Sequence, residues 1–270
     1  MDIFTVLLVQ PLTNGLIVFY KVLFGNMGLA IIGFTVLLRI ILNPLTKPYM
    51  QSMKKMREYA KEINKIKKRH ANDKQKQATA TADFYKQKGI NPAAGCLPYL
   101  LQIVVLIALF NVFNRVLSGD GEVINNINTL LIEPLRFSGD AVLNTKFLFL
   151  DVTKPDIITI PGFPISLPGP VLFLAAFVQV LSAKIMTPYV EGEQKLAQKT
   201  PQGSDDFSAA FQKSSLITFP IFTLLIGMSF PSGLAIYWFL FSLFQVVSQY
   251  RSSGWGGLTP WIKKVKMLKS

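Results

Sequence analysis

Residues 28–47 read GLAIIGFTVLLRIILNPLTK, an apolar run with one arginine, Arg39, near its middle. A bilayer core about 30 Å thick is crossed by about 20 helical residues at about 1.5 Å each, so the run predicts a membrane-spanning helix. Arg39 would lie about 16 Å along this helix from Gly28, close to the middle of the bilayer. A cation at that depth costs about 2.5–3.5 kcal/mol on insertion scales, which requires a polar or hydrated environment around it.

The same helix offers polar neighbours to the arginine. Thr35, Arg39, Asn43 and Thr46 follow one another at spacings of four, four and three residues, so they share one helix face. Pro44 lies in the same run, where it frees a backbone carbonyl and kinks the helix. A polar stripe on a kinked helix indicates a water-filled cavity. The alternative is that Arg39 snorkels toward the headgroups.

Four further apolar stretches complete the predicted fold. Half of the 270 residues are hydrophobic, and the mean hydropathy is +0.38. Only helices and closed barrels satisfy the backbone in lipid, so we expect an all-α polytopic membrane protein with five transmembrane helices. The predicted spans are residues 28–48, 93–116, 168–188 and two spans within 214–250, parted by a turn at 230–233.

The first 27 residues are predicted to form an interfacial amphipathic helix rather than a cleaved signal peptide or a sixth span. Asp2 replaces the usual basic start of a signal peptide, and Pro11 and Asn14-Gly15 interrupt the apolar pattern.

The charges predict an orientation. Residues 47–88 hold thirteen Lys/Arg and four acidic residues, whereas residues 116–168 hold three basic and six acidic residues. Residues 184–213 hold four of each, and the tail 251–270 has five basic residues and no acid. Basic loops stay in the cytoplasm, so we expect cytoplasmic segments at 49–92, 189–213 and 251–270, an extracytoplasmic loop at 117–167, and the N-terminus outside.

Residues 49–92 are predicted to form a basic helical hairpin. Tyr49, Met53, Met56, Ala60 and Ile63 make a narrow apolar seam on its first helix. Asp73 is the predicted N-cap of the second helix, residues 74–88, and Gly89 ends that helix.

The charge of this hairpin has two interpretations: attraction to anionic lipid, or a docking arm for an acidic partner such as a ribosome. Interleaved stacking aromatics are missing, so no sequence-specific nucleic acid is expected. The candidate partner-binding residues are Met53, Lys54, Lys55, Met56, Arg57 and Lys61.

Signals of covalent chemistry are missing. Cys96 and His70 are the single cysteine and histidine, too few for a disulfide or a usual zinc site, and no Ser-His-Asp, P-loop or GxGxxG pattern is present. We expect no enzyme, no metal and no cofactor. The predicted span cores contain no Asp or Glu, so Arg39 needs neutral partners, which could be Gln102, Gln179, Ser182, Thr218, Gln245 or the ring of Trp238.

Several ordered motifs resemble the signature of the YidC/Oxa/Alb membrane protein insertases. They cover about residues 10–250 and together are highly specific. The motifs are Gly28-Leu-Ala-Ile-Ile, Leu38-Arg39, Asn43-Pro44-Leu45-Thr46, Gln51-Ser52-Met53-Lys54-Lys55-Met56, Tyr85 to Pro92, Gly95-Cys96-Leu97-Pro98 with Gln102, Phe147 to Asp151 with Pro155-Asp156, and Phe230-Pro231-Ser232-Gly233-Leu234 with Tyr237-Trp238.

The resemblance implies five spans around a hydrophilic groove that is open to the cytoplasm and to lipid. Arg39 matches the groove arginine, and helix spacing adds Thr35, Asn43, Gln102, Gln179 and Gln245, with Trp238, as candidate groove residues. The family inserts nascent membrane proteins and works with the ribosome, the signal recognition particle route and the Sec translocon. We expect a compact bacterial version in the plasma membrane, without the large periplasmic domain of many relatives.

Two other functions stay open. A small-solute transporter usually carries paired ionisable groups or repeated halves, neither of which is found here. A lipid scramblase would also suit a polar groove that opens to lipid.

Overall fold

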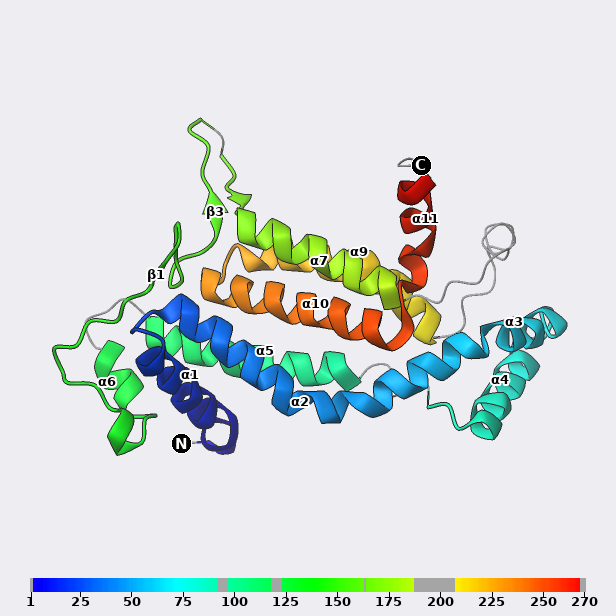
Figure 1. Ribbon diagram of the computed structural model, residues 1–270, viewed down its shortest axis with the longest axis horizontal. Helices are drawn as coiled ribbons and strands as arrows, with labels where there is room; N and C mark the ends of the chain where they lie inside the picture. Colours follow the sequence, from blue (N-terminus) through cyan, green and yellow to red (C-terminus); the bar gives the residue numbers. More distant parts are fainter. Residues whose placement is uncertain (1, 92–96, 118–122, 163, 187–206, 268–270) are drawn as a thin grey trace. The chain divides into compact units, whose positions relative to one another are not determined.

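The computed structural model describes residues 2–91, 97–117, 123–162, 164–186 and 207–267, and the chain is mostly helical there (Figure 1). It divides into two compact units. The first holds residues 1–42, 99–177 and 221–242, and the second holds residues 43–98, 178–220 and 243–270. The predicted cytoplasmic loop at 189–213 lies for the most part outside the described residues.

Five long helices correspond to the five predicted spans. They are α2 (Met27–Glu58), α5 (Leu97–Leu117), α7 (Pro170–Met186), α9 (Phe207–Gly227) and α10 (Ser232–Ser253). Within the described residues, three segments are long and apolar enough to cross a membrane: Thr5–Val22, Met27–Pro44 and Ser232–Ser252. The apolar parts of the other helices, Ile103–Phe113, Pro170–Ile185 and Leu216–Gly227, are shorter.

The N-terminal segment is more continuous than its sequence indicates. A π-helical turn, η1 (Thr5–Val9), leads directly into α1 (Gln10–Val22), so the helix continues through Pro11 although proline has no N–H to donate to the preceding turn. Asn14 lies inside α1 because its side chain has partners elsewhere: its amide donates to the Leu130 carbonyl and its oxygen accepts from the Ile132 N–H. By length and composition this segment could span a membrane, so its interfacial position stays a prediction.

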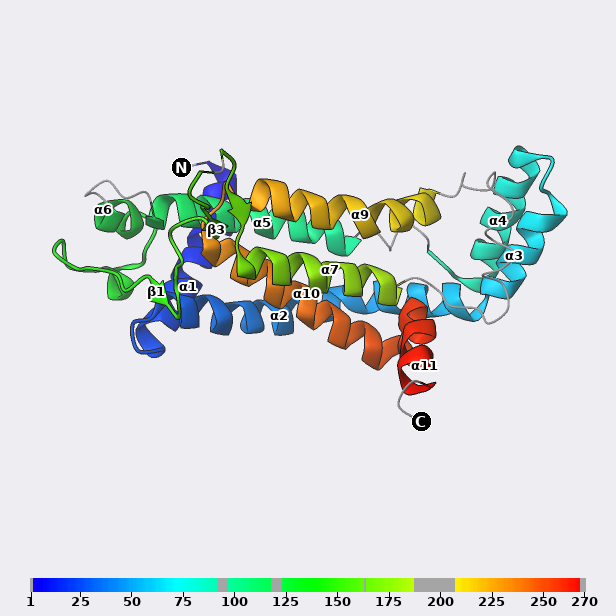
Figure 2. The ribbon, with the colours of Figure 1, turned by 90° about the horizontal axis from the view of Figure 1, so that it is seen from above.

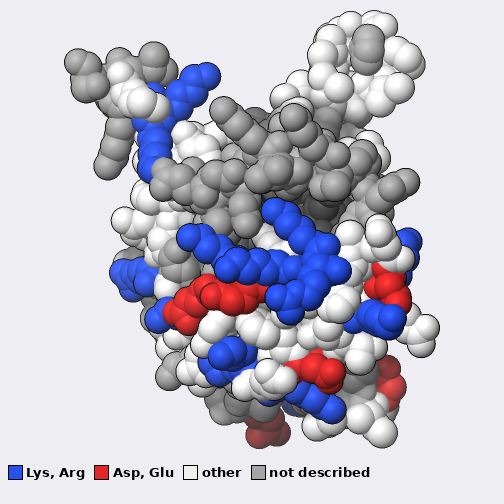
Figure 3. Space-filling view, turned by 90° about the vertical axis from the view of Figure 1, so that its right-hand side faces the viewer, with Lys and Arg blue, Asp and Glu red and all other residues white. Residues whose placement is uncertain are grey.

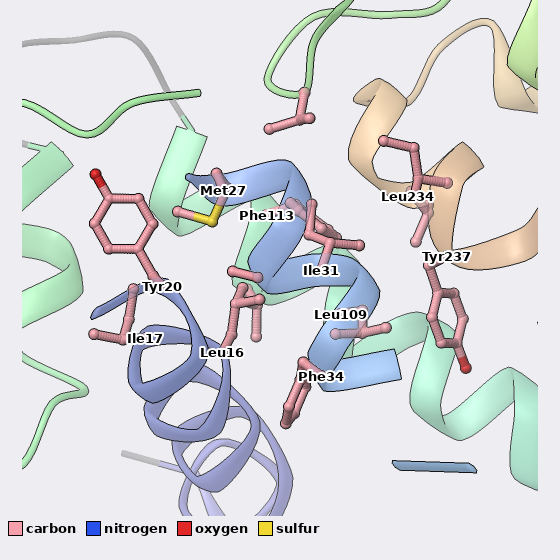
Figure 4. Close-up of a cluster of buried hydrophobic side chains, with 14 of the residues drawn as sticks. Leu16, Ile17, Tyr20, Met27, Ile31, Phe34, Leu109, Phe113, Leu234 and Tyr237 are labelled. Atoms are coloured by element: carbon pink, nitrogen blue, oxygen red, sulfur yellow. The ribbon is translucent and has the colours of Figure 1, made fainter. Parts of the chain in front are cut away.

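The core of the first unit is a continuous apolar cluster between helices. Figure 4 shows Leu16, Ile17 and Tyr20 of α1 turned toward Met27, Ile31 and Phe34 of α2. Leu109 and Phe113 of α5 and Leu234 and Tyr237 of α10 belong to the same cluster. These side chains follow helical spacings of three and four, which is why the apolar stripes of separate helices can face one another.

The predicted extracytoplasmic loop contains structure that an all-α fold does not include. It holds α6 (Val123–Asn128), the 3-10 turn η3 (Glu133–Leu135) and two short antiparallel hairpins. In the first hairpin β1 (Lys146–Phe147) pairs with β2 (Leu150–Asp151), and in the second β3 (Ile157–Ile158) pairs with β4 (Leu167–Pro168).

Residues 151–156 of this loop cap the first turns of two helices. The Ser232 and Gly233 N–H groups of α10 donate to the carbonyls of Lys154 (2.7 Å) and Val152 (3.0 Å). At α7, the Leu172 N–H donates to the carboxylate of Asp156 (2.8 Å), which is buried. These bonds satisfy backbone donors that a helix leaves unpaired at its N-terminus.

In the second unit, α2 runs on past the predicted boundary at residue 48 and ends at Glu58. The hairpin therefore consists of the last part of α2, then α3 (Ala60–Arg69) and α4 (Lys74–Lys88), which lie side by side in Figures 1 and 2. Pro44 and Pro48 are accommodated within α2.

The hairpin packs through a small core of its own. Ile63, Tyr85 and Ile90 are buried, with Met56, Tyr59 and Phe84 packed against them. The Asp73 carboxylate accepts from the Lys76 N–H (2.9 Å) at the start of α4, as predicted for an N-cap. Gly89 ends α4 in the left-handed conformation (φ +59°), also as predicted.

Lys55 of α2 binds the C-terminal end of α4. Its ammonium donates to the carbonyls of Lys88 (3.3 Å) and Gly89 (3.2 Å). A cation at this end satisfies unpaired carbonyls and complements the helix dipole.

The chain after α10 ends in a short 3-10 turn, η4 (Gly256–Leu258), and a basic helix, α11 (Thr259–Met267).

Replacing Asp156 with Ala should destabilise the fold by about 1–3 kcal/mol, because the Leu172 N–H would be left buried without its acceptor. Asp156→Asn keeps an acceptor oxygen and should lose less. Thermal unfolding in lipid nanodiscs measures both effects, with Asp140→Ala, an exposed acid of the same loop, as the control. Equal melting temperatures for all three variants would contradict the capping role.

Replacing Lys55 with Ala should loosen the end of α4. Amide hydrogen exchange over residues 85–90 should become about two- to fivefold faster, since a cation at a helix C-terminus contributes about 0.3–1 kcal/mol. The neighbouring Lys54, which pairs with Glu58 at 3.9 Å, is the matched control, and Lys54→Ala should leave this exchange unchanged. Equal effects of the two variants would exclude a specific cap.

Candidate functional site

Arg39 lies on α2 and contacts α10 within the first unit. One terminal guanidinium nitrogen donates to the Phe241 carbonyl (3.0 Å), and the guanidinium carbon lies 4.0 Å from the centroid of the Phe241 ring. Both of these contacts are with uncharged groups. Its side chain is half-buried.

Phe241 is a site residue that sequence reasoning missed. It stands 202 positions from Arg39, and no motif links the two. The only local signal is an aromatic pair on one face of α10, where the rings of Tyr237 and Phe241 lie 6.1 Å apart at a spacing of four.

The predicted polar stripe of α2 becomes more exposed along the helix. Thr35 is buried, and its hydroxyl donates to the Ile31 carbonyl of its own helix (2.6 Å). Arg39 is half-buried, and Asn43 is exposed. Thr35 thus has its hydrogen bond satisfied within the helix, whereas Arg39 donates to a carbonyl of α10.

The other predicted groove residues lie in several places. Trp238 is buried in the first unit, and its ring packs against Phe230 (centroids 6.2 Å apart). Gln179 of α7 and Gln245 of α10 are half-buried residues of the second unit. The Gln102 side chain lies outside the part of the chain that the structure describes.

The basic hairpin presents charge around its apolar core. Figure 3, turned so that α3 and α4 face the viewer, shows Lys and Arg side chains gathered with acids between them. Lys54 and Lys61 are exposed, whereas Met56 packs against the hairpin core and Lys55 caps α4. The predicted partner residues Met53 and Arg57 have side chains outside the described part.

Asp73 carries the one clear pKa shift of the described hairpin. The hydrogen bond from the Lys76 backbone N–H, together with the Lys76 ammonium 3.3 Å away, holds the pKa of the Asp73 carboxyl below its usual range. A lowered folded-state pKa means that the charged form favours folding. This stabilisation is present above the unfolded pKa and is lost as the pH falls through the folded one.

The end of the chain presents aromatic and basic side chains together. Trp261 of α11 lies under the ammonium of Lys184, which is 3.7 Å from its ring centroid. The ring of Trp255 lies 4.5 Å from that of Tyr250. Lys263 and Lys264 of α11 are exposed.

Metal chemistry has no obvious site in the described ranges: they contain no cluster of three or more His, Cys, Asp or Glu side chains.

Comparison with known proteins places this chain among membrane proteins of bacteria. A protein of Fusobacterium nucleatum named membrane protein insertase YidC is 33% identical over 226 residues, which are 84% of this chain and 85% of that protein. Proteins of the same name from Methylobacterium sp. (strain 4-46) and Pelagibacter ubique are 31% and 30% identical over 89% and 92% of this chain. This chain spans 34% and 39% of their lengths.

The family model described as 60Kd inner membrane protein matches residues 18–253, which include the spans, the hairpin and Arg39. The chain therefore belongs to the 60Kd inner membrane protein family.

Proposed function

We propose that this protein is a membrane protein insertase, which inserts nascent membrane proteins and helps them to fold. Membership of the family and the names of its relatives support the role. The observation that carries the mechanism is the charge of Arg39, which lies in an apolar helix and is held by a carbonyl and an aromatic ring.

The proposed groove is built by the five long helices, with Arg39 as its attractor. From their positions in the sequence, α2, α5, α7, α9 and α10 bring no Asp or Glu to membrane depth. A cation with no acid beside it at that depth attracts acidic or polar groups of a passing chain. Thr35, Asn43, Gln102, Gln179, Gln245 and Trp238 are the proposed residues that surround water and substrate.

The energetic problem is the desolvation of a hydrophilic substrate segment. A hydrated groove shortens the apolar path that this segment has to cross. Burial of the substrate's own apolar span supplies free energy, at about 25 cal/mol for each Å² removed from water. The membrane potential adds about 2.3 kcal/mol per acidic charge per 100 mV for outward movement. The protein would act through position and charge, without covalent chemistry.

The proposed orientation in the bacterial plasma membrane puts the N-terminus outside and the hairpin and tail in the cytoplasm. The unequal distribution of Lys and Arg supports it. The exposed lysines of the hairpin and of α11 would then be in the cytoplasm. There they could bind the ribosome, components of the signal recognition particle pathway, the Sec translocon or anionic lipid.

Replacing Arg39 with Ala should slow insertion of a substrate with an acidic translocated segment about tenfold, which corresponds to about 1.4 kcal/mol of lost stabilisation. Insertion of a matched substrate, with Asn and Gln in place of the acidic residues, should slow much less. Arg39→Lys keeps the charge, so insertion of the acidic substrate should slow much less than in Arg39→Ala. The measurement is protease protection of substrates in reconstituted vesicles.

Phe241→Leu is the matched control, because it removes the ring but leaves the charge and the carbonyl. It should affect acidic and neutral substrates equally. An unchanged ratio of the two rates in Arg39→Ala would remove the attractor role. Lipid flipping by the same vesicles at rates above those of insertion would favour the scramblase alternative.

Removing the α3–α4 hairpin should abolish insertion while the long helices stay folded. The structure suggests where to cut: Lys55 reaches the Gly89 carbonyl and the Lys88 ammonium lies 5.1 Å from the Tyr59 ring centroid, so Tyr59 can be joined to Gly89 by a short linker. Monodispersity and helical content in nanodiscs check the fold. Full insertion activity in a well-folded deletion variant would exclude a requirement for the hairpin.

A further inference from the structure

Two neighbouring turns of the first unit carry large apolar side chains in an unusual backbone conformation. Phe24 and Leu148 are the two non-glycine residues with positive φ in the described ranges, at +56° and +53°. Their side chains are 91% and 83% exposed, and Phe149, next to Leu148, is 69% exposed. We call Phe24, Leu148 and Phe149 the apolar wedge.

Phe and Leu rarely adopt the left-handed backbone conformation. Bulky side chains adopt it at a steric cost, and the helix end at Leu23–Gly25 is a place where glycine is the common choice. In water, the wedge would combine this backbone cost with three exposed apolar side chains. Neither feature helps folding, so a partner that covers the side chains would account for both.

Both turns are fixed to the beginning of α2. The Asn26 side chain donates to the Lys146 carbonyl (3.0 Å), and the Met27 N–H donates to the Asn144 carbonyl (3.0 Å). The Phe147 ring lies against Gly28 so closely that a Cβ at this position would collide with it. The wedge is therefore held in one place beside α2, with the β1–β2 hairpin next to the helix in Figures 1 and 2.

The wedge continues the exposed apolar surface of two candidate spans. Val22 at the end of α1 is 70% exposed, and Leu29 in the first turn of α2 is 36% exposed. Thr5–Val22 and Met27–Pro44 are both long and apolar enough to cross a membrane. Lys146, next to Phe147 in β1, is exposed, and its ammonium could reach lipid phosphates. Lys21 is also exposed, but its ammonium donates to the Pro134 carbonyl (3.3 Å) and lies 5.2 Å from the Phe137 ring centroid.

We propose that the apolar wedge is embedded in the membrane leaflet at the N-terminal end of α2, at the boundary of headgroups and acyl chains. Lipid would cover all three side chains and compensate for the backbone conformation of the turns. A protein partner fits less well, because three side chains supply much less than the roughly 800 Å² per partner of a stable interface.

The test places a fluorescent probe on each turn of the full-length protein. In a Cys96→Ser background, which leaves no other cysteine, single cysteines at 24, 149 and 140 are labelled with an environment-sensitive dye. The variants are reconstituted in vesicles of phosphatidylcholine and phosphatidylglycerol. Position 140 is an exposed aspartate of the same loop and serves as the aqueous control.

Brominated acyl chains should quench the probes at 24 and 149 at least about twofold more than the probe at 140, and iodide should show the opposite order. Equal iodide access at all three positions would overturn the proposal. Protection at 24 and 149 that arises only after a second protein is added would also overturn it, in favour of a protein docking surface.

A second variant separates lipid contact from folding. Phe24→Gly with Leu148→Gly keeps residues that accept the left-handed backbone and removes two of the three apolar side chains. The probe at 149 should then lose about half of its quenching by brominated lipid. Val142→Gly, which removes a side chain 91% exposed in the same loop, should leave the quenching at 149 unchanged. Unchanged quenching in the double variant would show that the wedge does not act as a unit.

Discussion

A guanidinium in an apolar helix needs hydrogen-bond acceptors, and the Phe241 carbonyl supplies one to Arg39 from another helix. A backbone carbonyl has two lone pairs, so it can accept this bond and still take part in its own helix. The ring of the same residue lies 4.0 Å from the guanidinium carbon and adds a cation–π contact. Neither contact neutralises the arginine, as a carboxylate would. If α2 spans the membrane as predicted, a positive charge at this position would be costly and its field would be little screened.

The ends of the helices obey the same constraint as the arginine. A helix leaves four N–H groups unpaired at its start and four carbonyls at its end, and no lipid tail can satisfy them. Residues 151–156 supply acceptors to α7 and α10 through two carbonyls and the Asp156 carboxylate. At the end of α4, which is exposed and predicted to lie in the cytoplasm, Lys55 supplies a donor to carbonyls that water could also reach. Segments that read as loop or surface charge in the sequence thus complete the hydrogen bonds of the helices.

The residues that the sequence predicts well are those whose role depends on near neighbours. The helix start at Asp73, the stop at Gly89 and the turn before Ser232 follow from local backbone chemistry, and the structure confirms them. Periodicity likewise finds the long helices, although α2 continues ten residues past its predicted end at residue 48 because Pro44 and Pro48 do not break it. Asn14 reads as a turn residue because the sequence does not reveal its bonds to Leu130 and Ile132.

Contacts between residues far apart in sequence escape this kind of reasoning. Phe241, the capping role of Asp156 and the binding of Lys55 to Gly89 depend on distant partners. For the same reason, the sequence cannot distinguish the roles of Lys54 and Lys55. The two have identical side chains and adjacent positions, yet one pairs with Glu58 on its own helix and the other caps α4. From residue type and charge alone, both lysines are predicted to bind a partner.

The changing exposure of the polar face of α2 gives the proposed groove its physical logic. Thr35 is buried, and its hydroxyl donates to the Ile31 carbonyl of the same helix. Asn43, two turns further on, is exposed, and Arg39 between them is half-buried. Arg39 therefore lies where this helix face changes from buried to exposed. A polar substrate segment that moved along this face from Asn43 toward Thr35 would lose its hydration gradually. It would reach the charge of Arg39 before the buried part of the face. At that point electrostatic attraction would lower the barrier to desolvation most.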